Sequence, residues 1–125
     1  MVVLDSWALL AYLKDEPAAG RIEGEWLARA VAISSISLGE ALYIRIRERG
    51  EDAAVAEIAT IRKRSTLVEA DWSLVRAAAR VKARGGLSYA DAFCVATAER
   101  LDAPLWTGDP EILGLDTEVE LVDLR

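Results

Sequence analysis

The chain has 125 residues, of which 53% are hydrophobic, and its formal net charge at pH 7 is −6. This length suits one domain with a core of its own, and the hydrophobic content excludes a disordered chain. No apolar run reaches the length of a membrane span, and the negative charge argues against a protein that coats nucleic acid by bulk attraction.

Short apolar stretches alternate with amphipathic ones along the chain. In chain order, the pattern predicts a strand at Val2–Leu4, helices at Ser6–Leu13 and 18–30, a strand at 31–36, helices at 37–49 and 51–64, a strand at Thr66–Val68, helices at 71–84 and 88–101, and strands at Leu105–Thr107 and 119–124. Alternation of this kind predicts an α/β fold with three α/β/α layers, in which a mainly parallel central sheet of about five strands carries helices on both faces.

Capping residues support several of these helices. Ser37 and Glu40 have the spacing of a capping box at the start of the third helix, and Ser88 and Asp91 have the same spacing near the end of the chain. Gly50 is suited to end the third helix. The helix boundaries are therefore expected close to these residues.

The absence of one residue type and the scarcity of another narrow the chemistry. There is no His, which excludes Ser-His-Asp catalysis, Cys-His catalysis and His-based zinc sites. Any catalysis must therefore use carboxylates, hydroxyls, Lys or Arg. The single cysteine, Cys94, cannot form an internal disulfide, and we expect it to be a small buried residue in a cytoplasmic protein without a secretion signal.

Four carboxylates occur where the predicted strands end or the helices after them begin. Asp5 follows the first strand, Glu40 lies in the helix after the second, Asp91 opens a later helix and Asp109 follows the fourth strand. Right-handed crossovers place all such junctions of a parallel sheet on one edge, where ligands usually bind. We therefore expect the four acids to meet.

A cluster of this kind needs a counter-charge. Two carboxylates about 4 Å apart repel by roughly 4 kcal/mol at an effective dielectric constant near 20. Mg²⁺ prefers carboxylate and water oxygens, and it can orient a water, lower its pKa and offset charge on a phosphoryl group. With no His, metal-bound hydroxide is the expected nucleophile. The neighbouring hydroxyls of Ser6 and Thr107 are candidates to hold a metal-bound water or a phosphate oxygen.

Each acid also has a purely structural interpretation. Glu40 can close the Ser37 capping box, Asp91 can be a first-turn helix charge, and Asp109 before Pro110 can be a turn or N-cap residue. Asp5 has the least obvious structural purpose. The placement of all four together is what points to a metal site.

Three segments resemble a known family: LDSWALLAYL near the start, SLGEALYIRIR in the middle, and LSYADAFCVATAERLDAPLWTGDPE near the end. They are similar to the PIN domain, and in particular to VapC-type toxins of bacterial and archaeal toxin–antitoxin pairs. The resemblance extends over a single domain at 1–125 and matches the family's acidic residues to Asp5, Glu40, Asp91 and Asp109. It implies a Mg²⁺- or Mn²⁺-dependent endoribonuclease that forms a homodimer and is inhibited by a VapB-like antitoxin.

The sequence departs from the family pattern at two positions. Trp7 stands two places after the first acid, where many members have a small or polar residue. Gly108 stands where Asn or a charged residue is frequent. Some members carry a further acid, for which Glu111 and Asp116 are the candidates, and neither is assigned to the site.

Two other functions are alternatives to the nuclease. A catalytically silent PIN-like module that binds protein or RNA is the alternative, and retention of all four acids favours the enzyme. A Mg²⁺ phosphohydrolase of the haloacid dehalogenase type would need a second Asp where Trp7 stands.

Two surfaces were candidates for partners. Basic side chains can steer RNA phosphates or form solvated helix faces; they are the cluster Arg45, Arg47, Arg49, Arg62, Lys63 and Arg64 and the row Arg76, Arg80 and Arg84. Apolar residues on helices 18–30 and 37–49 can line a groove for an antitoxin helix or can belong to the core; they are Trp26, Leu27, Leu42, Tyr43 and Ile46.

Overall fold

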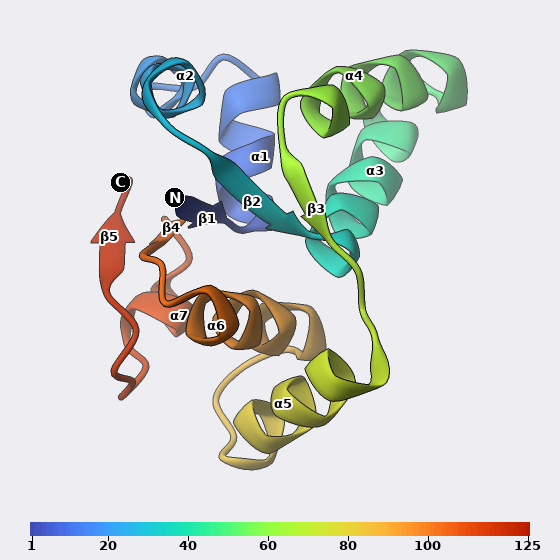
Figure 1. The fold of residues 1–125 in the computed structure, drawn as a ribbon. Coiled ribbons are helices and arrows are strands. Elements are labelled where there is room, and N and C mark those ends of the chain that lie inside the picture. The colour runs from blue at the N-terminus through green and yellow to red at the C-terminus, as the bar shows by residue number, and fades with distance from the viewer.

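A computed structural model describes residues 1–125 (Figure 1). Five strands form one sheet in the order β3-β2-β1-β4-β5, and every neighbouring pair is parallel. The strands are β1 (Val2–Leu4), β2 (Val31–Ser34), β3 (Thr66–Val68), β4 (Leu105–Thr107) and β5 (Leu121–Asp123). The predicted three-layer α/β/α fold is thus confirmed, and the sheet is entirely parallel.

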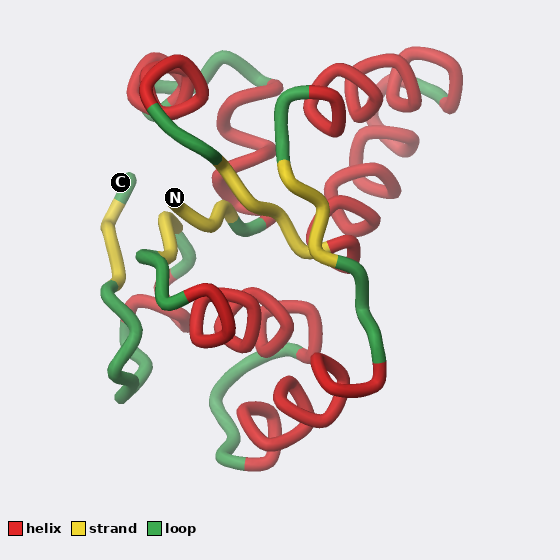
Figure 2. The backbone as a smooth tube through the Cα atoms, in the orientation of Figure 1, coloured by secondary structure: helices red, strands yellow, loops and turns green.

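Helices occupy the connections between the strands, as the tube in Figure 2 shows. They are α1 (Ser6–Leu13), α2 (Ala19–Ala28), α3 (Ser35–Arg49), α4 (Glu51–Lys63), α5 (Trp72–Ala83), α6 (Tyr89–Leu101) and the short α7 (Pro110–Leu113). Only α7 was not expected. None of these helices combines the length and the apolar character that a membrane crossing requires.

The direction of the strand order decides which face each helix covers. The chain moves outward from β1 to β2 and β3 through α1 to α4, and these helices lie on one face of the sheet (Figure 1). It then returns past β1 to β4 through α5 and α6, which lie on the opposite face. Right-handed crossovers require this change of face when the direction reverses.

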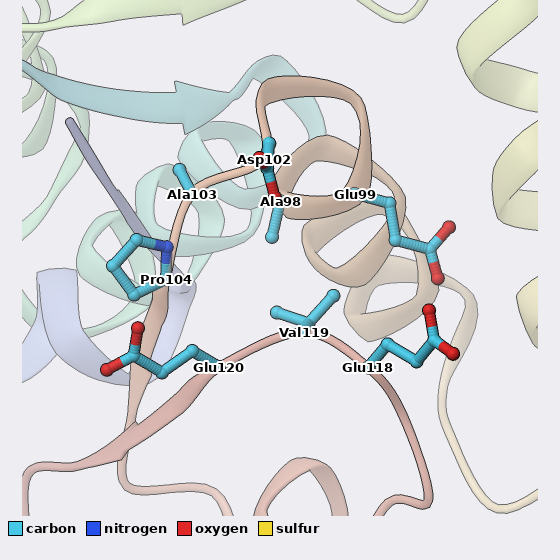
Figure 3. Close-up of a pocket in the computed structure, with 8 residues that line it drawn as sticks. All are labelled: Ala98, Glu99, Asp102, Ala103, Pro104, Glu118, Val119 and Glu120. Atoms are coloured by element: carbon cyan, nitrogen blue, oxygen red, sulfur yellow. The ribbon is translucent and has the colours of Figure 1, made fainter.

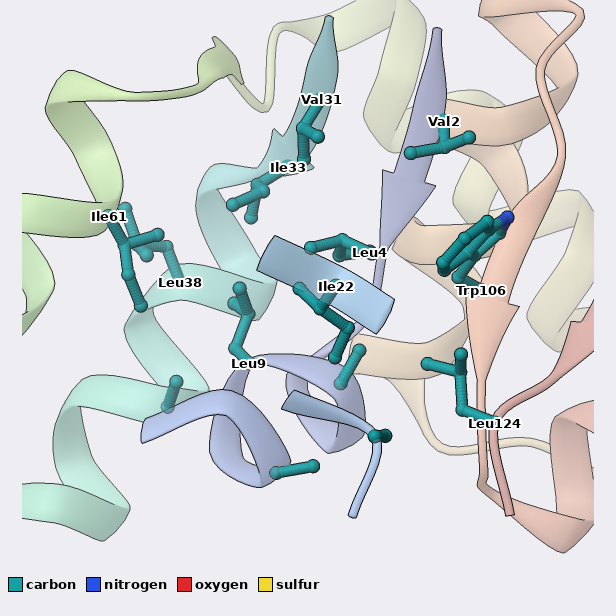
Figure 4. Packing of buried hydrophobic residues seen from close by; sticks show 14 of the residues in the cluster. Val2, Leu4, Leu9, Ile22, Val31, Ile33, Leu38, Ile61, Trp106 and Leu124 are labelled. Carbon is teal, nitrogen blue, oxygen red and sulfur yellow. The ribbon is translucent and has the colours of Figure 1, made fainter. Parts of the chain in front are cut away.

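The core is divided between the two faces by the alternation of β1. Val2 and Leu4 point to the side of α1 to α4, where they pack with Leu9, Ile22 and other residues (Figure 4). Val3, between them, packs on the side of α5 and α6. All three β1 side chains are fully buried, as expected for a central parallel strand covered on both faces.

The junction between β2 and α3 differs from the prediction. The strand ends at Ser34, and α3 begins at the next residue without a loop. Ser34 is the N-cap, and its hydroxyl accepts the N–H of Ile36 at 3.2 Å. Ser37 therefore lies inside the helix, fully buried, and the capping box with Glu40 does not exist. Three serines near the end of this β-prone run could each serve as the N-cap of α3. The side chains that α3 buries favour the first of them, Ser34.

The apolar groove expected between α2 and α3 is absent, because α1 lies between these helices and packs against both (Figure 1). Trp26 of α2 packs edge-on against Tyr12, with ring centroids 4.7 Å apart. Leu42 of α3 instead lines an apolar cavity of about 470 Å³ with Val55 and Ile58 of α4. Leu27 and Tyr43 are exposed, so the residues expected in one groove lie in different settings.

Two arginines of the basic cluster on α3 and α4 form ion pairs within the protein, instead of a free surface for RNA phosphates. Arg45 is buried, and its guanidinium donates to Glu57 at 2.9 and 3.1 Å and to Glu48 at 2.9 Å. Arg64 pairs with Glu23 at 2.9 Å. These arginines join helices to each other and are not free to bind phosphate.

Candidate metal centre

Asp5 lies at the centre of the sheet edge and is almost completely buried, with 1% of its surface exposed. It is the N-cap of α1, because Oδ1 accepts the N–H of Ala8 at 2.9 Å. Asp5 therefore has a structural role, as a helix N-cap, that the sequence did not suggest. The second oxygen, Oδ2, accepts the hydroxyl of Thr107 at the end of β4. Asp5 thus caps a helix with one oxygen and is tied to the neighbouring strand with the other.

The turn after β4 holds Asp109 next to Asp5. Thr107 Oγ1 donates to Asp5 and accepts the backbone N–H of Asp109 at 2.9 Å. Asp109 caps the short helix α7, because its Oδ1 accepts the N–H of Glu111 at 2.8 Å. Its Oδ2 receives no hydrogen bond. Thr107 therefore positions two acids, and its hydroxyl is not free for the water or phosphate oxygen that we expected it to hold.

Glu40 reaches the same edge from α3. Ser6, the first residue of α1, donates its hydroxyl to Glu40 Oε1. This contact joins two segments 34 residues apart in sequence and takes the place of the absent capping box. As with Thr107, the hydroxyl expected to contact a ligand instead holds a carboxylate in place.

Asp91 enters from the N-terminal turn of α6 on the opposite face of the sheet. Its N–H donates to Ser88 Oγ at 3.1 Å, so Ser88 is the N-cap, as predicted. Beneath the acids, Cys94 and Ser37 form a buried contact of 2.8 Å between Sγ and Oγ. Burial, together with the charges of nearby acids, raises the pKa of the Cys94 thiol, which therefore stays a neutral packing residue as expected.

The carboxylates act on one another electrostatically. Burial, reinforced by the charges of Asp91 and Asp109, raises the pKa of Asp5 to about 7. Burial likewise raises the pKa of Asp91 to about 6, and the charges of Asp109, Glu40 and Glu111 add to the effect. No Lys or Arg is among the main influences on either group. The site therefore has an uncompensated negative potential.

Glu111 lies close to two of the predicted acids, whereas Asp116 does not. One carboxylate oxygen from each of Asp91, Asp109 and Glu111 can be chosen so that all three lie within 4.8 Å of one another. Asp116 instead lines a separate cavity with Arg84 and Glu99. Oxygen donors that converge without a cation among them suit Mg²⁺ or Mn²⁺. The signal for Glu111 was its place in the first turn after Asp109.

Position in the sheet explains why the acids converge here. β1 and β4 are neighbours in the sheet, but the helices that follow β1 pack on one face and the helices that precede β4 pack on the other. The strand order therefore reverses between β1 and β4. Asp5 and Asp109 follow these two strands. In open parallel sheets, the crevice at such a reversal is where ligands bind.

A second acidic hollow lies at the other edge of the sheet. A cavity of about 330 Å³ is formed where α6 ends and where β4 and β5 begin (Figure 3). Glu99, Asp102, Glu118 and Glu120 surround it. It lies at the opposite ends of the strands from Asp5 and Asp109 and shares no residue with the candidate metal centre.

Comparison with solved structures identifies close similarities in fold. A structure of VapBC2 from Rickettsia felis bound to promoter DNA aligns over 98% of each chain with a TM-score of 0.79 and 15% identity. DNA-bound VapBC from Salmonella typhimurium aligns over 100% of each chain, with a TM-score of 0.79 and 16% identity. Mycobacterium tuberculosis VapC20, a toxin that cleaves the sarcin–ricin loop, covers 95% of this chain and 98% of its own, with a TM-score of 0.73 and 20% identity.

Comparison by sequence gives the family. Among curated proteins, none matches the chain significantly. A family model of the PIN domain, however, matches residues 2–117, which is nearly the whole chain. The chain belongs to the PIN domain family.

Proposed function

We propose that this protein is a Mg²⁺- or Mn²⁺-dependent endoribonuclease and the toxin of a VapBC-type toxin–antitoxin pair. The observation that carries the proposal is the convergence of Asp5, Glu40, Asp91 and Asp109 at the strand reversal, joined by Glu111. Repulsion among buried carboxylates opposes folding unless a cation offsets it. Retaining such a cluster is most readily understood if the site binds metal.

The carboxylates divide into two groups by their hydrogen bonds. Asp91, Asp109 and Glu111 provide the oxygens that lie closest together, and Asp109 keeps Oδ2 free. Asp5 and Glu40 are held by Thr107 and Ser6. A divalent cation bound here would lower the pKa of a water and offset the charge of a phosphodiester. The fixed carboxylates supply the orientation, and their acceptor oxygens can take a proton from that water.

RNA as the substrate is supported by family membership and by the fold of VapC20, which cleaves the sarcin–ricin loop. The chain itself has no His, and no basic side chain is among the main influences on Asp5 or Asp91, so we expect a phosphate to depend on the cation for its counter-charge. An antitoxin partner is supported by the VapBC complexes that share the fold. We extend the proposal to a homodimer on family resemblance alone.

The nuclease proposal is tested by incubating the purified protein with single-stranded RNA and Mg²⁺ or Mn²⁺, with and without chelator. We expect cleavage that stops in chelator and is lost in Asp91→Asn. Asp116→Asn, which changes an acid outside the site, is the matched control and should cleave normally. RNA binding without cleavage at any metal concentration would favour a catalytically silent module.

The toxin proposal is tested separately, by co-expression with the adjacent small reading frame. We expect the two proteins to copurify and RNA cleavage to be suppressed in the complex. An acidic site can be blocked by an Arg or Lys of the partner, because that charge would replace the cation without its chemistry. A chain that copurifies with nothing and whose effect on growth is unchanged by its neighbour would refute the toxin–antitoxin pairing while leaving the nuclease standing.

A further inference from the structure

The two positions that depart from the family pattern are in direct contact. A Cβ atom added to Gly108 would lie 2.3 Å from Cζ2 of Trp7, 2.4 Å from Cε2 and 2.5 Å from Cη2. Real Cβ atoms essentially never approach other atoms this closely. The Trp7 indole thus occupies the space that a side chain at position 108 would fill, and only glycine permits this.

This contact lies on the rim of the metal centre. Trp7 is in the first turn of α1, two residues after Asp5. Gly108 separates Thr107, which donates to Asp5, from Asp109. The ring therefore spans the two neighbouring strand ends that carry Asp5 and Asp109.

The indole N–H of Trp7 has no partner in the protein. Trp26 shows the alternative, since its Nε1 donates to Ser65 Oγ at 3.1 Å. Trp7 makes no such bond, and its Nε1 is not a buried atom; the one buried side-chain nitrogen or oxygen without a hydrogen bond is Glu25 Oε2, which forms an ion pair with Arg29 Nε at 2.7 Å. Trp7 Nε1 is therefore open to solvent, and it is bonded to Cε2, one of the ring atoms that face Gly108.

Trp7 offers a free, neutral hydrogen-bond donor at this edge. The hydroxyls of Ser6 and Thr107 already donate to Glu40 and Asp5, and the charges that act most strongly on Asp5 are acidic. A substrate with acceptor oxygens thus meets carboxylates that repel it and, at Trp7, a neutral N–H that does not. Phosphate and nucleobase oxygens are acceptors of this kind, and an indole ring can also stack on a base.

We propose that Trp7 is a substrate-binding residue of the metal centre, which donates its indole N–H to a nucleotide of single-stranded RNA beside the cleaved bond. Gly108 is the residue that makes room for it. This inference rests on the proposed nuclease function and adds a contact to the same site.

The decisive variant is Trp7→Phe, which keeps an aromatic ring and removes the N–H. Binding of fluorescein-labelled single-stranded RNA is measured by anisotropy in the Asp91→Asn background, so that no cleavage intervenes. We expect about a tenfold loss of affinity, the size of one hydrogen bond to a charged acceptor. Trp26→Phe, which removes an indole N–H that donates to Ser65 Oγ at 3.1 Å and not to the acidic site, is the matched control and should bind RNA normally.

Two further measurements separate substrate contact from support of the turn. With Asp91 intact, Trp7→Phe should retain the full rise in melting temperature caused by Mg²⁺. Gly108→Ala should weaken RNA binding by displacing the indole, and should add no further loss in a Trp7→Ala protein, because the two residues act through one contact.

The inference is overturned if Trp7→Phe binds RNA as tightly as its parent, or if it loses Mg²⁺ stabilisation and RNA binding together. The second result would make Trp7 a residue that only supports the turn. A wild-type protein that neither binds nor cleaves RNA would instead refute the nuclease function itself, so the two failures are distinguishable.

Discussion

Replacing Asp5 with Asn should stabilise the metal-free protein at alkaline pH. Asn can keep the cap of α1, because its Oδ1 can accept the Ala8 N–H that Asp5 accepts at 2.9 Å. Its amide can donate to Thr107 Oγ1, whose hydrogen then turns away. The substitution therefore removes the buried charge and preserves the contacts that hold the residue.

The size of the effect follows from the pKa of Asp5, which is about 7 in the folded protein and about 4 when unfolded. Between these values the folded state holds the extra proton, so stability falls as pH rises through this window. Once the pH is well above 7, the accumulated loss of stability is about 4 kcal/mol. Roughly 2.5 kcal/mol of this loss falls between pH 5 and pH 8. That is a large part of a typical stability of about 5–15 kcal/mol.

The assay is urea unfolding of both proteins at pH 5 and pH 8 in chelator. The midpoint of the wild type should fall by roughly 1–2 M more than that of Asp5→Asn over this range, and no His titrates to obscure the difference. Asp71→Asn is the matched control, because Asp71 is also an N-cap but its pKa is lowered by Arg100; this variant should lose stability at pH 8. If Asp5→Asn is destabilised equally at both pH values, the buried charge of Asp5 is not what limits stability.

Three further outcomes are expected. Mg²⁺ at 100 times its dissociation constant should add about 2.7 kcal/mol to the stability of the wild type; Glu111→Gln should reduce this gain in thermal unfolding, whereas Asp116→Asn should not, and equal gains in both would remove Glu111 from the site. Ser34→Ala should cost about 1 kcal/mol in urea unfolding, because it removes the N-cap of α3; no measurable change would return the helix start to a later residue. Glu57→Gln should cost roughly 3 kcal/mol, since it leaves the buried Arg45 without its main counter-charge, and a neutral result would show that Glu48 alone compensates it.

Much of the fold could be predicted because its signals are local. Short apolar runs became strands, the N-cap Ser88 was correct, and Gly50 ends α3 as expected, at a positive φ of 85°. The prediction that the four acids lie at the same edge of the sheet rested on the handedness of the crossovers, which is nearly invariant. These features depend on few residues each and do not require knowledge of distant contacts.

The details that sequence reasoning missed depend on distant contacts. The N-cap of α3 was predicted at Ser37, three residues after the actual N-cap, Ser34. The choice among the three serines depends on which side chains α3 buries against α6. Ser6 and Thr107 hold carboxylates because Glu40 and Asp5 come within reach only after folding. The contact between Trp7 and Gly108 spans about a hundred residues of sequence and could be noticed only as two unusual positions.

The central claim is that the acids at the strand reversal form one metal site whose occupancy permits RNA cleavage. It is tested most directly by a Mn²⁺ titration in which bound metal is followed by electron paramagnetic resonance and RNA cleavage is followed in the same samples. We predict that cleavage rises in proportion to the bound metal, and that Asp91→Asn weakens binding and abolishes cleavage. Cleavage in the absence of bound Mn²⁺, or full binding by Asp91→Asn, would contradict the account.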